Sequence, residues 1–191
     1  MEQNKEMTAQ ESLKLISETL NNSRRDILSK SAKYYVLWGS LLTVFSLVIY
    51  LLWHSTGKAS WNLLWFAMPA FGYLFAWMLG KNDKALPESF VGSLTGKVWG
   101  IFGLFSITLS AIAVSIVPMP ITFTIIILLG IAESITGVIL KNWPIIVGGF
   151  LLGVGGAVAA VLLKSEAQLL LFTLGGVILA ATGLVVKYQY K

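Results

Sequence analysis

One acidic residue, Glu133, lies inside a long apolar stretch of this chain, where a carboxyl group could hold a proton or a cation. It follows the start of the apolar run 121–140 by twelve residues, which corresponds to about 18 Å at a helical rise of ~1.5 Å per residue. An ionised carboxylate that deep in a bilayer costs several kcal/mol. We therefore expect Glu133 to face a bundle interior or a wet cavity, or to remain protonated.

Two interpretations of Glu133 follow from the polar residues available to it. No Lys or Arg lies inside an apolar run to pair with it, so Glu133 could be a proton or cation site or bind a cationic substrate. Alternatively, it is a neutral carboxylic acid that a Ser or Thr hydroxyl binds, and it holds the bundle together. The candidate intramembrane polar site comprises Glu133 and five hydroxyl-bearing residues: Ser106, Ser110, Ser134, Thr136 and Thr182.

Other kinds of chemistry find little support in the sequence. The chain has no cysteine and one histidine, His54, which excludes disulfides and thiol catalysis and is too few for a zinc site. Phosphate-binding loops and HExxH or GxSxG motifs are absent. The sequence therefore predicts a protein that is not an enzyme and holds no cofactor or metal. His54 is expected to be an exposed interfacial histidine, with pH sensing as the alternative.

The composition is that of a polytopic α-helical membrane protein. Hydrophobic residues make up 56 % of the 191-residue chain and charged residues 12 %, against roughly 25 % charged in a typical soluble domain. A helix needs about 20 apolar residues to cross a bilayer, because the hydrocarbon core is ~30 Å thick. Six runs of that length predict six membrane-spanning helices, at residues 34–53, 61–80, 98–117, 121–140, 143–163 and 169–186.

Prolines and small residues indicate how these helices begin, end and pack. Pro69 lies inside the second run and is expected to kink it, whereas Pro118 and Pro120 predict a tight turn between the third and fourth runs. Pro144 is expected in the first turn of the fifth helix. Two stripes of small residues at a spacing of four predict close helix packing: Gly149, Gly153 and Ala157, and Gly96 and Gly100.

The basic residues predict the orientation of the chain in the membrane. Twelve Lys and Arg residues lie on the side that carries both termini, and two lie on the other side. Because cytoplasmic loops carry an excess of Lys and Arg, both termini are expected in the cytoplasm. The net charge of +5 is then explained by these loops and by anionic lipid, and the lipid bilayer rather than nucleic acid is the expected partner.

Residues 1–33 form a polar segment before the first span and contain a predicted amphipathic helix at about residues 8–30. Thr8 and Glu11 form a capping-box pattern at its start. Arg24 lies on its apolar face, so the helix could rest on the inner membrane surface with Arg24 reaching lipid phosphates. Alternatively, the face docks onto a protein partner or a second copy of the chain. This candidate docking face consists of Leu13, Ile16, Leu20 and Ile27.

Spans three and four resemble spans five and six. Residues 130–141 align without gaps to residues 176–187, with four identities at an offset of 46: two glycines, a threonine and a lysine. The alignment predicts a parallel repeat of two helical hairpins within an array of three. Chance similarity between apolar, glycine-rich segments is the alternative.

Residues 10–39 carry a more specific pattern, in which the polar stretch Gln-Glu-Ser-Leu-x-Leu-Ile at 10–16 is followed by Leu37, Trp38 and Gly39 at the start of the first span. This pattern resembles a group of small uncharacterised multi-span proteins of Gram-negative bacteria. The resemblance implies an inner-membrane location and brings no activity with it. We therefore predict a non-enzymatic inner-membrane protein that acts through protein partners, with a small transporter or channel that uses Glu133 as the alternative.

Overall fold

The computed structural model describes residues 8–81 and 89–189, and within these ranges the chain is helical and contains no strand. Six helical segments are long and apolar enough to cross a membrane, which confirms the predicted all-α class with six such segments. The elements in chain order are α1 Ala9–Thr56, η1 Ala59–Phe66, α2 Met68–Gly80, α3 Phe90–Ser115, α4 Ile121–Leu140, α5 Trp143–Phe150, η2 Leu151–Gly155, α6 Gly156–Leu162, η3 Ser165–Gln168 and α7 Leu169–Gln189.

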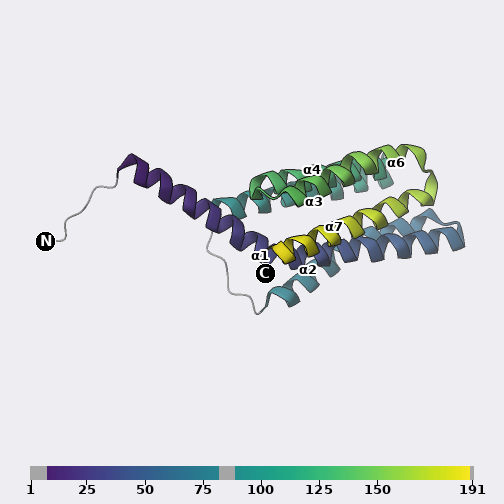
Figure 1. The fold of residues 1–191 in the computed structure, drawn as a ribbon. Coiled ribbons are helices and arrows are strands. Elements are labelled where there is room, and N and C mark those ends of the chain that lie inside the picture. Colours follow the sequence, from purple (N-terminus) through teal and green to yellow (C-terminus); the bar gives the residue numbers. More distant parts are fainter. Residues whose placement is uncertain (1–7, 82–88, 190–191) are drawn as a thin grey trace.

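The first helix, α1, is a single element of 48 residues, so the helix predicted at about 8–30 and the span predicted at 34–53 are parts of one continuous helix. Its N-terminus carries the predicted capping box, in which the Glu11 N–H donates to Thr8 Oγ1 at 3.2 Å and the Thr8 N–H donates to Glu11 Oε2 at 2.9 Å. No Gly or Pro interrupts the junction, and Leu28, Ala32 and Tyr35 are buried along it on one face. At ~1.5 Å per residue α1 is about 72 Å long, and its N-terminal part extends well beyond the other helices (Figure 1). We call this part, which carries Leu13 and Ile16, the α1 extension.

The second predicted span begins as the 3₁₀ helix η1, and Pro69 lies in the first turn of α2 rather than at a kink inside a long helix. The reason is that a proline lacks the N–H that an interior position needs, whereas the first turn tolerates it. Pro144 lies in the first turn of α5, as predicted, and Asn142 caps that helix by accepting the Ile145 N–H at 3.3 Å. The predicted turn around Pro118 separates α3 from α4.

The third and fifth spans differ from their predicted forms. Helix α3 begins at Phe90, eight residues earlier than expected, because Ser89 Oγ accepts the Gly92 N–H at 3.1 Å and caps the helix there. The fifth span contains one π-helical turn, η2, between α5 and α6. Such turns are frequently found at functional sites in helices.

The core lies among α1, α4, α7 and the α5–η2–α6 segment. Helix α1 runs antiparallel beside α7, and α4 runs beside α5, η2 and α6 (Figure 1). Helix α3 packs against α4, and α2 packs against α1. Buried apolar residues form two clusters, one that includes Leu28, Leu140 and Ile145 and one that includes Ile126 and Leu152. Along α4 and α5, Glu133 and Gly148 fall between these two clusters.

Glycines allow both main helix pairs to approach closely. A Cβ placed on Gly130 of α4 would lie 2.5 Å from the Gly153 nitrogen and 2.6 Å from the Gly149 oxygen. A Cβ on Gly176 of α7 would lie 2.6 Å from the Gly39 oxygen of α1. The predicted packing role of Gly149 and Gly153 is therefore confirmed. The second predicted stripe differs: among the described residues, no atom lies within 4 Å of a Cβ placed on Gly96 or Gly100.

Candidate functional site

The side chain of Glu133 has no exposed surface and lies where α4 meets α5 and α7. The absence of a side chain at Gly148 of α5 makes room for it. A Cβ placed on Gly148 would lie 3.0 Å from Glu133 Oε1 and 2.8 Å from Thr182 Oγ1 of α7. The Glu133 carboxyl group therefore fills the space that the missing side chain of Gly148 leaves between closely packed backbones. Because the carboxyl group has no exposed surface, no room remains for a water molecule against it.

Neither carboxyl oxygen of Glu133 has a hydrogen-bond partner among the described residues. The Tyr35 hydroxyl of α1 is also buried without a partner among the described residues. Leaving a buried polar group unsatisfied costs about 1–3 kcal/mol, so native proteins rarely keep one without a reason. Of the two interpretations of Glu133, the neutral carboxylic acid bound by a Ser or Thr hydroxyl therefore finds no support, because no described hydroxyl binds the carboxyl group.

Thr136 and Thr182 are the two predicted site residues that are buried on helices adjoining this space. Thr136 Oγ1 donates to the Ala132 carbonyl at 2.8 Å, and Thr182 Oγ1 donates to the Ile178 carbonyl at 2.9 Å. Both hydroxyl hydrogens are thus used within their own helices. Thr182 lies beside Gly148, as Glu133 does, so the structure brings Thr182 to the carboxyl without joining the two by a hydrogen bond.

The three serines of the predicted site do not bind Glu133. Ser134 lies on the adjacent face of α4, against Gly149, and lines an apolar groove of about 540 Å³ between α4 and the α5–η2–α6 segment. Glu133 is not among the residues that line this groove. Ser106 and Ser110 are half-buried on α3, and the Ser106 hydroxyl is itself buried without a partner among the described residues.

The candidate docking face on α1 is divided between the bundle and solvent. Leu13 and Ile16 are 68 % and 57 % exposed on the extended part of the helix. Leu20 and Ile27 instead are partly buried and pack against the buried cluster that contains Leu28. The predicted four-residue face was therefore wrong in extent, because the bundle reaches further along α1 than the apolar run.

Arg24, on the same face, is bound to protein. Its Nε–H donates to the Ile139 carbonyl near the end of α4 at 3.0 Å, and its Nη1 donates to Asn21 Oδ1 at 3.1 Å. A helix leaves its last carbonyl groups without partners, and a cation there is favourable. Arg24 thus ties α1 to the end of α4 and holds its guanidinium in one orientation.

Sequence reasoning missed Gly148, which makes room for Glu133, and the buried hydroxyl of Tyr35. Tyr35 was counted as the edge of an apolar run, although a tyrosine buried in a span needs a partner for its hydroxyl. His54 lies elsewhere, at the far end of α1, where its Nδ1 is 3.4 Å from Glu166 Oε1 and both side chains are partly exposed. Within residues 8–81 and 89–189, no group of three or more His, Asp or Glu residues is arranged to hold a metal ion.

No protein-family model, curated protein or solved structure matched the chain. The resemblance of residues 10–39 to small multi-span proteins stays a prediction. What the chain does must therefore be argued from two features of its own structure: the unsatisfied carboxyl group of Glu133, and the exposed apolar residues on the extension of α1.

Proposed function

We propose that this chain is a non-enzymatic inner-membrane protein whose α1 extension docks a helical segment of another protein in the cytoplasm. The observation that carries the proposal is the continuity of α1. Apolar side chains at Leu13 and Ile16 are exposed on a helix that continues without a break into the bundle. Helices that present apolar residues at a spacing of three or four commonly bind a partner helix or groove.

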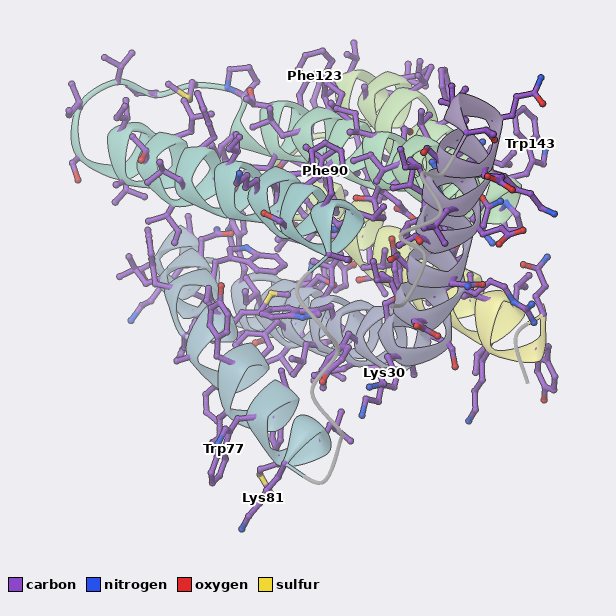
Figure 2. All side chains as sticks on the ribbon, turned by 90° about the vertical axis from the view of Figure 1, so that its left-hand side faces the viewer. Lys30, Trp77, Lys81, Phe90, Phe123 and Trp143 are labelled. Carbon is purple, nitrogen blue, oxygen red and sulfur yellow. The ribbon has the colours of Figure 1, made fainter. Side chains whose placement is uncertain are left out.

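The ends of the helices support an orientation with both termini in the cytoplasm. Figure 2 looks at the bundle from the end where α1 begins, and there Trp77 and Lys81 point away from the other helices while Trp143 lies at the margin. Trp77 and Trp143 are 64 % and 71 % exposed, and the Lys81 ammonium lies 5.7 Å from the centre of the Trp77 ring. Tryptophan is typical of both membrane interfaces, and an excess of lysine and arginine is typical of the cytoplasmic one.

Two features favour a protein partner over the membrane surface for this extension. A helix that lies flat on a membrane would have to turn sharply before a span, and α1 has no proline or π-helical turn to allow that. Surface-bound helices are also rich in Lys and Arg on the polar face. The extension instead carries both signs, as in Lys14 and Glu18, whose Nζ and Oε1 atoms are 4.0 Å apart.

Replacing both Leu13 and Ile16 by serine is expected to abolish partner capture. Removing two large apolar side chains from an interface costs about 1.5–3 kcal/mol each, so recovery of a cross-linked partner from native membranes should fall at least about ten-fold. The measurement is quantitative mass spectrometry of proteins that co-purify with the full-length chain after cross-linking.

The matched control is Leu15→Ser, which removes an equally exposed leucine (53 %) from a different side of the same helix. It should leave the captured proteins unchanged. An identical set of captured proteins from the double serine variant and the unmodified chain would rule out docking through this face. If the partner that the double variant loses is a second copy of the chain, the extension is a dimerisation helix instead.

A second candidate function, a small proton or cation transporter, is favoured by the unsatisfied carboxyl group of Glu133. The π-helical turn η2 lies close along the chain to Gly148 and offers a place where the fifth span could bend. In proteoliposomes with a pH-sensitive dye inside, Glu133→Gln should abolish proton or cation flux, whereas Glu166→Gln should retain it. Wild-type flux no faster than that of empty vesicles would exclude transport.

We also propose that α4 and α7 are equivalent members of a repeated unit. Gly130 and Gly176, 46 residues apart, each seat the backbone of a neighbouring helix. Gly137 and Gly183 have the same separation, and each also lies against a neighbouring helix. Gly137 contacts Ile146 of α5, and Gly183 contacts α1. This shared use of glycines supports the predicted equivalence of the fourth and sixth spans, although α4 makes its glycine contacts with α5 and α7 makes them with α1.

A further inference from the structure

A second pocket lies where α1 passes the end of α4, and Glu133 does not line it. It has a volume of about 240 Å³ and opens to the surface of the bundle. Two helices contribute its walls, α1 before the first predicted span and α4 at its last residue and cap. The lining residues are Asn21, Arg24, Arg25, Leu28, Leu140 and Lys141.

Three of the lining residues, Arg24, Arg25 and Lys141, are cations, and none of them forms a salt bridge with an acidic residue of the ranges 8–81 and 89–189. Arg24 is held in place by its hydrogen bonds to Ile139 and Asn21. Lys141 caps α4 in the left-handed conformation, with φ 52° and ψ 42°. Cations gathered without a counter-ion attract an anion, and guanidinium groups match phosphate geometry especially well.

The base of the pocket has the opposite character. Leu28 and Leu140 are 1 % and 2 % exposed and belong to the same buried apolar cluster. The pocket also lies where the apolar run of α4 ends, which is the level at which a membrane-spanning helix meets the lipid headgroups. The pocket therefore has an apolar base and a cationic rim, and it lies at the level of the lipid headgroups. Such a site suits a phosphate that is joined to an apolar body.

We propose that this pocket binds the phosphodiester headgroup of an anionic phospholipid. Arg25 and Lys141 supply charge at the rim, and Arg24 supplies a guanidinium that its bonds to Ile139 and Asn21 hold in place. Basic pockets between helices at a membrane interface are a recurring way of holding anionic lipid. The site differs from the docking face, because Leu13 and Ile16 do not line it.

The experiment uses the full-length chain in detergent and measures bound lipid by native mass spectrometry during titration with phosphatidylglycerol or phosphatidylcholine. Phosphatidylglycerol should bind more tightly. The Arg25→Gln/Lys141→Gln double variant should weaken that binding by about five-fold for each charge removed, because a basic residue near an anionic membrane contributes ~1 kcal/mol. Arg24 is left unchanged, since it also ties α1 to α4.

The matched control is Lys97→Gln/Lys187→Gln, which removes the same charge from exposed residues that do not line the pocket. It should leave phosphatidylglycerol binding within two-fold of the unmodified chain. Equal weakening in both double variants, or equal affinity for the two lipids, would overturn the proposal. If inorganic phosphate displaces phosphatidylglycerol at similar concentrations, the pocket is a soluble phosphate site instead. If the pocket variant loses an acidic protein while its lipid binding stays intact, the pocket is a protein site.

Discussion

The Glu133→Met variant is expected to be more stable than the unmodified protein by about 1–3 kcal/mol. Methionine is unbranched, close to glutamate in size and apolar, so it removes two buried oxygen atoms without partners and leaves no cavity. A gain in stability on removing a native side chain is uncommon. It would mean that the chain retains Glu133 for a purpose other than folding. Equilibrium unfolding in mixed detergent micelles, followed by tryptophan fluorescence, measures the difference.

Two further substitutions at Glu133 separate polarity from volume. Glu133→Gln keeps polar atoms in the same space and should remain near the stability of the unmodified protein. Glu133→Ala empties a fully buried site between α4, α5 and α7 and should be destabilising, since large-to-small changes in cores leave cavities. A loss of stability in the methionine variant would contradict the expectation and would show that the carboxyl group holds the bundle together.

Features that depend on neighbouring residues could be predicted from the sequence. The length of an apolar run shows whether a helix can cross a bilayer. A Thr that is followed three residues later by a Glu predicts a capping box. Pro118 and Pro120 cannot lie in a helix interior without breaking a backbone hydrogen bond, so they predict a helix boundary. The burial of Glu133 was also predictable, because the cost of exposing a carboxylate to lipid leaves few other places for it.

Features that depend on helix rotation and on distant partners could not be predicted in this way. One residue turns a helix by roughly 100°, so the sequence does not decide which hydroxyl faces Glu133. The Thr136 and Thr182 hydroxyls both donate to backbone carbonyls of their own helices, and the space for Glu133 is provided by Gly148 of another helix. The division of the docking face has a similar cause: Leu20 and Ile27 are partly buried against a cluster that includes residues from other helices, which a pattern along α1 does not reveal.

The Gly130→Ala variant is expected to be strongly destabilised, although alanine is a better helix former than glycine. The added methyl group would lie 2.5 Å from the Gly153 nitrogen and 2.6 Å from the Gly149 oxygen. Both contacts are with backbone atoms of the fifth span, which do not yield by a change of rotamer. Helices α4 and α5 would therefore have to separate. Overpacking of a close-packed interior costs about 1–3 kcal/mol, and the unfolding transition in mixed micelles should shift accordingly.

Gly100→Ala on α3 is the matched control, because no described atom lies within 4 Å of the added methyl group. Its stability should stay the same or rise by up to about 1 kcal/mol from the better helix propensity of alanine. Gly176→Ala should lower the stability by about as much as Gly130→Ala, since a methyl group at Gly176 would lie 2.6 Å from the Gly39 oxygen. Equal stability of the Gly130 and Gly100 variants would contradict the close α4–α5 contact. A harmless change at Gly176 beside a harmful one at Gly130 would instead argue against the proposed equivalence of α4 and α7.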